Sequence, residues 1–271
     1  MLPNGAASVP RIDTTIAHPA RRYDYWLGGK DNFAADRESG DAIQAVYPHI
    51  RIAAVENRRF LRRVVRYLAE EADIRQFLDI GTGLPTVENT HEVAQAIDPA
   101  ARIVYVDNDP LVLVHARALL TSHPAGRTSY IDANLRDPAR ILADPALIDV
   151  LNLREPIALL IVAVLHFLPE DEQAYTAVKT LMNALPSGSY LAASHATYDL
   201  LPDGTAEAFA TRSVPGSGNF TGRSRTQFLR FFDGLDLVPP GVEVVSHWRP
   251  DSDDTPPPEH VSVYGGLALK R

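Results

Sequence analysis

The sequence predicts an α/β fold in which a mostly parallel sheet is covered by helices on both faces. Three observations lead to this prediction. From Arg75 onward, short apolar segments alternate with segments of helical periodicity. The apolar segments are almost continuous, as in strands that are buried on both faces. The chain has 271 residues, 45% of them hydrophobic, so it can bury a large core as a single domain.

The first part of the chain differs from this alternating region. Residues 1–12 are small and polar and are expected to be flexible. Residues 13–70 are expected to form an N-terminal helical cap. Within the cap, apolar residues recur at helical spacing between Val55 and Leu68, and arginines occupy the opposite face. This pattern predicts a long helix at the end of the cap.

Residues 71–200 are expected to form the α/β core. Strands are predicted at residues 76–80, 101–107, 128–133, 156–167 and 187–197. Helices are predicted at residues 86–97, 110–120, 138–142 and 171–185. The acidic residues that open the last of these helices suit the positive end of its dipole.

Residues 201–271 are expected to supply a lid segment and a C-terminal β-hairpin. Residues 199–222 are polar and rich in glycine, which is typical of a mobile lid. A helix is predicted at residues 224–235. Strands at residues 242–248 and 261–270 flank an acidic, proline-rich loop, and two strands joined in this way are most simply antiparallel.

The composition argues against several classes of function. There are 26 basic and 34 acidic residues, and the net charge of −8 opposes general nucleic-acid binding. The chain has no cysteine, which excludes disulfides, thiolate metal sites and cysteine nucleophiles. Its nine histidines show no zinc-ligand spacing, so no metal is expected. Neither a signal peptide nor an apolar run of about 20 residues is present. We therefore expect a cytoplasmic protein without membrane contact.

A glycine-containing turn follows the first predicted strand, in the segment FLDIGTGLPT. Gly81, Thr82 and Gly83 lie where parallel α/β sheets bind nucleotide-like ligands. Asp79 precedes this turn, and an acid there opposes the phosphate of a dinucleotide. Thr86 also stands where the dinucleotide fingerprint requires a third glycine. Both features favour S-adenosylmethionine (SAM), which has no phosphate and whose ammonium group Asp79 can hold.

Two further acidic residues end the next two predicted strands. Asp107 lies 24 residues after Gly83, in position to accept hydrogen bonds from both ribose hydroxyls, and Asn108 follows it. Asp132 is placed to accept from the adenine amino group, while Ala133 offers a backbone donor. Each acid also has a structural alternative, as a helix cap or in an Asx turn. Together, three carboxylates at the ends of successive parallel strands predict a cofactor site at one edge of the sheet.

The segments LDIGTGLPT, VYVDNDP, YIDANLRDP and VLHFLPEDE resemble the ordered motifs of class I SAM-dependent methyltransferases. The block RRYDYWLGGKDNFAADR, followed by ENRRFLRR, resembles a narrower bacterial group of these proteins that was long catalogued as a domain of unknown function. The resemblance extends from about Ile12 to Lys270. It implies a Rossmann-like fold with a seven-stranded sheet and one antiparallel strand, SAM as cofactor and S-adenosylhomocysteine (SAH) as product. Pro85 departs from the general pattern, in which many members have a third glycine.

The resemblance also implies that the N-terminal segment folds over the cofactor. Tyr23, Tyr25 and Trp26 are available to face the sulfonium, because cations are held near aromatic rings. Gly28 permits close approach of the backbone, and Arg58 is placed to pair with the methionine carboxylate. As alternatives, the aromatic residues are packing anchors, and the arginines of the long helix form a solvated face.

Methyl transfer is an in-line displacement that depends mainly on alignment, so an obvious catalytic residue is not required. His166, at the end of the fourth predicted strand, is the candidate base, with a cofactor contact or simple packing as its alternative. His195 is expected mainly as a buried structural histidine. We therefore expect a SAM-dependent methyltransferase with a small-molecule acceptor. The alternatives are a non-catalytic SAM-binding sensor or partner-binding protein and, less favoured because of Asp79, a nicotinamide-dependent oxidoreductase.

Overall fold

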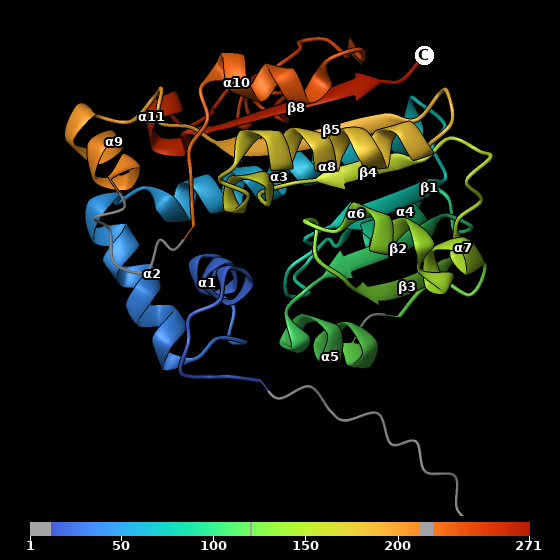
Figure 1. Ribbon diagram of the computed structural model, residues 1–271, viewed down its shortest axis with the longest axis horizontal. Coiled ribbons are helices and arrows are strands. Elements are labelled where there is room, and N and C mark those ends of the chain that lie inside the picture. Colours follow the sequence, from blue (N-terminus) through green and yellow to red (C-terminus); the bar gives the residue numbers. More distant parts are fainter. Residues whose placement is uncertain (1–11, 120, 212–218) are drawn as a thin grey trace, which may run out of the picture.

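The computed structural model describes residues 12–119, 121–211 and 219–271 (Figure 1). The N-terminal segment predicted to be flexible lies almost entirely outside this range, as does part of the predicted lid. In the described residues, none of the helices has both the length and the apolar character needed to cross a membrane.

The centre of the molecule is a sheet with the strand order β3-β2-β1-β4-β5-β8-β6. Its five parallel strands are β1 (Gln76–Ile80), β2 (Arg102–Asp107), β3 (Arg127–Asp132), β4 (Ala158–Ile161) and β5 (Tyr190–Ala196). The strand β8 (Val263–Leu269) runs antiparallel to β5. Two short strands, β6 (Asp236–Leu237) and β7 (Glu243–Val244), also pair with β8, which brings the total to eight. The predicted sheet, mostly parallel with one antiparallel strand, is confirmed.

The strand order reverses between β1 and β4, and the carboxyl ends of the parallel strands share one edge of the sheet. Asp79 pairs with Tyr105 across β1 and β2, and Asp107 pairs with Asp132 across β2 and β3. In open α/β sheets, ligands bind at this edge, beside the point of reversal. The register therefore brings the three predicted carboxylates to one edge.

Helices cover both faces of the sheet. In Figure 1, α8 (Asp171–Ala184) lies in front of the sheet and α3 (Ile50–Glu70) lies behind it. The helix α3 packs against α4 (Thr90–Ile97), while α6 (Pro138–Ala143) packs against α7 (Pro145–Val150) and α8. The helix α5 (Pro110–Leu119) contacts β3. Phe60, Val64 and Leu68 are fully buried, as the periodicity of this helix predicted.

The N-terminal helices α1 (Pro19–Trp26) and α2 (Ala34–Val46) pack on each other and on α3. In Figure 1 the arrowheads of β2 and β4 point toward α1. The cap therefore stands at the carboxyl edge of the sheet. The described residues also form the shorter helices α9 (Asp203–Ala210), α10 (Arg225–Leu229) and α11 (Pro258–Val261), and a 3-10 helix at Arg230–Phe232 follows α10.

Several element boundaries differ from the prediction. The helix expected from residue 86 begins at Thr90, because Asn89 and Glu92 form a capping box there. The apolar run at residues 156–167 contains a strand of only four residues, followed by a 3-10 helix at Leu165–Phe167. The strand expected at residues 242–248 is two residues long, because the chain turns after Val244, whose carbonyl accepts from the N–H groups of His247 (2.7 Å) and Trp248 (3.2 Å).

Candidate cofactor and acceptor site

The turn after β1 approaches the neighbouring loops closely on one side and is open on the other. Gly81 has φ +74°, its N–H donates to the carbonyl of Val106 (2.7 Å), and a Cβ at this position would overlap the side chain of Val164. Gly83 has φ +68°, but a Cβ there would meet no described atom within 4 Å. Glycine is thus required at residue 81 by close packing. At residue 83 the backbone borders free space in which a ligand can lie.

Asp107 is buried, yet it keeps hydrogen-bonding capacity. Its Oδ2 accepts from the N–H of Gly83 (2.9 Å), and its Oδ1 accepts from the N–H of Asp109 (2.9 Å). Burial raises the pKa of this carboxyl group, whereas the two backbone donors lower it. An ionised carboxylate has about four acceptor positions. Asp107 can therefore fix the glycine turn and still accept two further hydrogen bonds.

Asp79 is 4% exposed, and its Oδ2 accepts a hydrogen bond from the hydroxyl of Thr90 (2.6 Å). Burial raises the pKa of this carboxyl group to about 6, and the nearby Arg58 lowers it in part. Within the described part of the chain, Asp79 takes part in none of the ion pairs. A buried carboxylate is costly without a cationic or strongly donating partner. The site is therefore chemically suited to a bound ammonium group.

Arg58 lies on α3, close to this carboxylate. Its Nη2 donates to the carbonyls of Val87 and Glu88, at 3.3 Å each, in the loop that follows the glycine turn. Its charge also lowers the pKa of Tyr23, which burial raises. Arg58 and Asp79 thus supply opposite charges at the same end of the site. That is the pattern required by a ligand carrying both an ammonium and a carboxylate.

The remaining predicted cofactor residues have different surroundings. Thr82 lies within the turn, and its N–H is 3.4 Å from the carbonyl of Val106. Asn108 and Asp132 are exposed at the edge of the sheet. The N–H of Ala133, expected to face adenine, donates to the carbonyl of Asp107 (3.2 Å). It continues the ladder between β2 and β3, so it is not a free donor.

A buried ion pair connects the cap to the loop after β2, and the sequence analysis did not find it. Arg21 donates from Nε and Nη2 to the two carboxylate oxygens of Asp109, at 2.9 Å each, and both side chains are at most 4% exposed. His18 Nδ1 lies 3.1 Å from Asp109. These partners hold the pKa of Asp109 well below its usual range, although burial opposes them. Asp109 follows Asp107 by two residues, so the cap is attached directly beside the predicted ribose site.

Tyr25 and Trp26 connect α1 to α2 and α3. The Tyr25 hydroxyl donates to Asp41 (2.7 Å), and the guanidinium of Arg51 lies 4.5 Å from its ring centre. Trp26 Nε1 donates to the carbonyl of Gly40 (3.3 Å). These contacts correspond to the packing alternative for the two aromatic residues.

The loop after α1 turns at two glycines. Gly28 has φ +83° and is exposed. A Cβ at Gly29 would overlap the carboxylate of Asp24, which accepts from the N–H of Asp31 (3.0 Å) and from Asn32 Nδ2 (2.8 Å). The pair of glycines thus shapes the cap loop around a buried carboxylate.

The arginines of α3 are largely engaged in contacts within the protein. Arg62 and Arg66 both pair with Asp251, which lies in the acidic C-terminal loop. Arg63 is buried and donates to the carbonyls of Val245 and Trp248. This face of the helix therefore binds the C-terminal loop of the same chain.

A directional chain of hydrogen bonds connects the cap to the loop after β4. The N–H of Ala163 donates to Ser194 Oγ (2.9 Å), which donates to Asn57 Oδ1 (2.6 Å). Asn57 Nδ2 donates to the Tyr23 hydroxyl (3.0 Å), which donates to the carbonyl of Ala54 (2.9 Å). Ala163 has φ +60°, which is unfavourable for alanine. The network thus fixes a strained turn directly beside the glycine turn of β1.

His166 follows that turn and is 8% exposed. Its ring lies 4.4 Å from the ring of Phe167, 5.0 Å from Phe220 and 5.6 Å from His195. Its Nδ1 is buried and has no hydrogen-bond partner among the described residues. Burial, followed by the charges of Arg223 and Arg22, lowers the pKa of His166 to about 3. At pH 7 a proton on this ring would cost about 5 kcal/mol, so His166 is neutral and a weak base.

His195 has a structural role. An arginine only donates, so His195 Nε2 accepts from Arg223 Nη1 (2.7 Å) and its Nδ1–H donates to the carbonyl of Ala196 (2.7 Å). Arg223 is 1% exposed and also binds Asp171 and the carbonyls of Leu165 and Leu168. Arg223 thereby holds the 3-10 helix that carries His166.

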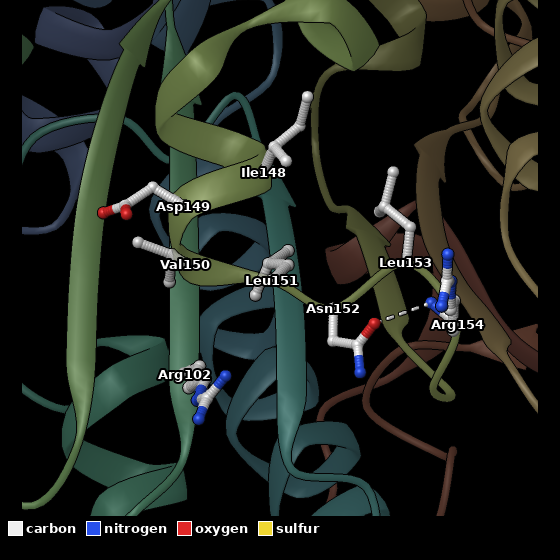
Figure 2. Close-up of a pocket in the computed structure, with 8 residues that line it drawn as sticks. All are labelled: Arg102, Ile148, Asp149, Val150, Leu151, Asn152, Leu153 and Arg154. Atoms are coloured by element: carbon white, nitrogen blue, oxygen red, sulfur yellow. Dashed lines mark hydrogen bonds between the residues drawn. The ribbon is translucent and has the colours of Figure 1, made fainter.

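Two surface depressions lie away from these residues. One, of about 400 Å³, is lined by Arg102 and residues 148–154 (Figure 2). The other, of about 450 Å³, includes Arg75, Gln76 and Tyr190. Both contain residues from the amino ends of strands, whereas Asp79 and Asp107 lie near or at the carboxyl ends. Neither depression belongs to the predicted cofactor site.

Comparison with known proteins places the chain in a family. A family model described as S-adenosyl methyltransferase matches residues 5–271. A DUF574 family protein from Streptomyces avermitilis MA-4680 is 46% identical, with 96% of this chain and 100% of that chain covered and a TM-score of 0.90. A candidate methyltransferase from Thermobifida fusca YX is 39% identical, with 98% and 100% covered and a TM-score of 0.88. No curated protein matches the chain. The chain belongs to the S-adenosyl methyltransferase family, and SAM is its cofactor.

Proposed function

We propose that this protein transfers the methyl group of SAM to a small-molecule acceptor at the carboxyl edge of its sheet. The observation that carries the proposal is the pair of buried carboxylates on neighbouring strands. Asp107 retains unused acceptor capacity beside the open backbone at Gly83, and Asp79 makes no ion pair within the described residues. These features fit an adenosyl ligand with an ammonium group.

Each end of the ligand has a complementary group. Asp107 would accept from the ribose hydroxyls, and Asp79 would accept from the ammonium group. Arg58 would pair with the methionine carboxylate. Asp132 would accept from the adenine amino group, whereas the N–H of Ala133 is already used within the sheet. Arg21 and Tyr23 would hold the cap over the ligand through Asp109 and Asn57.

When bound, SAM supplies a methyl group on a positively charged sulfur. The residues of this chain need to align an acceptor with that methyl group and to exclude water. The strained turn at Ala163 and the packing of Val164 against Gly81 bring the loop after β4 beside the cofactor turn. Because His166 is a weak base, we assign it to acceptor contact and not to proton removal.

A small acceptor is favoured by the surroundings of His166. The imidazole is 8% exposed and lies against Phe167 and Phe220, so a reacting group must enter between side chains. The net charge of −8 also opposes a nucleic-acid acceptor.

The first test is calorimetric titration with SAM, SAH and NAD. We expect micromolar binding of SAM and SAH and no binding of NAD. The second test is transfer of a labelled methyl group from SAM to a bacterial extract separated by molecular size. Label in the small-molecule fraction supports the proposal. Label only in protein or nucleic acid contradicts a small acceptor, and SAM binding without transfer to any fraction identifies a non-catalytic binding protein.

A further inference from the structure

We propose that the acceptor is an acidic aromatic hydroxyl compound, of the phenol class, which binds as an oxyanion against His166 and is methylated on that oxygen. This inference rests on the proposed function and specifies its substrate class. It follows from the hydrogen bonding, the electrostatics and the aromatic surroundings of one buried imidazole.

The imidazole of His166 is more than nine-tenths buried, yet its Nδ1 lacks a partner among the described residues. A buried polar group without a partner is unfavourable, and one at a ligand site is explained most simply by a contact with the ligand. His166 lies two residues after Val164, the residue that packs against the glycine turn of the cofactor site. His166 thus belongs to the loop that borders the cofactor turn.

The charges around His166 are predominantly positive. Arg22 on α1 and Arg223 before α10 both act on the ring, and both side chains are buried. Arg223 is paired with Asp171 of α8, and Arg22 interacts electrostatically with Asp36 of α2. His195 of β5, which also faces the ring, is kept neutral because burial lowers its pKa well below the usual range.

This field disfavours a proton on His166 and favours a negative charge on a neighbouring ligand. A neutral imidazole carries one N–H, and that donor can stabilise an oxyanion. Burial also lowers the pKa of Arg22 to about 10, which shows that its charge lies in poorly solvated surroundings. An anion bound nearby would add to the stabilisation that Arg22 receives from Asp36 and Ser39, whereas a neutral amine would not.

The aromatic surroundings indicate a planar ligand. His166 contacts Phe167 and Phe220, and Phe220 in turn lies 6.4 Å from the ring of Tyr198 and 5.8 Å from Phe209. Rings at these separations form offset or edge-to-face contacts, and an aromatic ligand can join them in the same way. Gly222 adds to this packing, because a Cβ there would overlap the ring of Tyr198.

The reaction is balanced without a base in the enzyme. A lone pair of the phenolate oxygen forms the new oxygen–carbon bond, and the sulfur–methyl bond breaks with its electrons remaining on sulfur. The products are a methyl ether and SAH. The proton of the phenol is lost to solvent when the acceptor binds, because the charges of the two arginines lower the pKa of the bound hydroxyl by more than burial raises it.

The test uses 4-nitrophenol as a probe, because its absorbance distinguishes the phenol from the phenolate. The protein is saturated with SAH, whose binding is measured first by calorimetry. We expect the bound probe to show the phenolate spectrum, with an apparent pKa about one pH unit or more below that of the free probe. The neutral analogue 4-nitroaniline, which is close in size to the probe, is expected to bind about tenfold more weakly.

Variants locate the oxyanion. His166→Phe keeps a ring at this position but removes the N–H, and we expect it to weaken 4-nitrophenol binding about tenfold while SAH binding is retained. His260→Ala is the control: the His260 ring stacks on His49 and makes no ring contact with His166 among the described residues, so this variant should change neither affinity.

Three results would overturn the inference while leaving SAM binding intact. They are bound 4-nitrophenol in its neutral form, equal affinity for 4-nitroaniline, and no probe binding to a protein that binds SAH. Failure to bind SAH at all would instead overturn the proposed function, and this inference with it.

Discussion

Replacing Asp107 with alanine is expected to weaken SAH binding by about 1–3 kcal/mol, or roughly 5-fold to 150-fold. The carboxylate already accepts one backbone hydrogen bond on each oxygen, from Gly83 and Asp109. The two acceptor positions that remain are those we assign to the ribose hydroxyls. Alanine removes all four acceptor positions, so the substitution also destabilises the folded protein in the absence of ligand. We expect the free energy of unfolding to fall by about 2 kcal/mol, from the two buried N–H groups left without partners.

Binding and stability are therefore measured on the same preparations of the Asp107→Ala variant. Urea unfolding gives the stability change, and calorimetric titration with SAH gives the affinity at a temperature at which the variant is fully folded. Asp132→Ala is the comparison variant, because Asp132 is exposed at the end of the neighbouring strand: its loss should affect stability little and should weaken SAH binding only through the proposed adenine contact. SAH affinity within twofold of the native value, in folded Asp107→Ala protein, would refute our placement of the ribose.

Three further predictions concern neighbouring residues. Burial raises the folded-state pKa of Asp79 to about 6, so its ionisation destabilises the ligand-free protein as the pH rises from about 4 to 6. In urea unfolding at pH 8, the Asp79→Asn variant should therefore be up to about 3 kcal/mol more stable than the native protein, and it should bind SAH more weakly. Gly83→Ala should abolish SAH binding and lower the free energy of unfolding by only about 1–2 kcal/mol. Gly81→Ala should instead unfold the turn, and melting curves followed by circular dichroism compare the stability of the two variants. Arg21→Met leaves Asp109 buried without its main partner, so the free energy of unfolding should fall by about 3–5 kcal/mol, and stopped-flow displacement should show faster SAH release. A variant as stable as the native protein would contradict this role of the ion pair.

The core strands were predicted closely because each consists of a short run of apolar residues. QFLDI and RIVYVD are buried along nearly their whole length, and each ends at or next to an acidic residue. The predicted fourth strand was too long because hydrophobicity does not distinguish a strand from a buried turn. Apart from His166, residues 162–167 are apolar, but Ala163 adopts a left-handed conformation that ends the strand.

The hydrogen-bond partners of polar residues were harder to predict. The Arg21–Asp109 pair joins residues 88 positions apart. The five-residue network that starts at Ala163 and passes through Asn57 connects four segments that are distant along the chain. No local pattern indicates such pairs. The N–H of Ala133 illustrates the opposite error, because an apparently available donor is used by the adjacent strand.

The alternation of strands and helices could be predicted from the sequence alone, as could the position of Asp79, Asp107 and Asp132 along successive strands. Those features depend on short-range periodicity, which the backbone geometry of helices and strands imposes. The tertiary structure alone decided the chemical state of each group. Asp79 has a raised pKa, and His166 is a neutral, unpartnered imidazole near two arginines, because segments distant in sequence remove water and bring charges together. Burial and long-range charge act through space, and only the folded chain defines those distances.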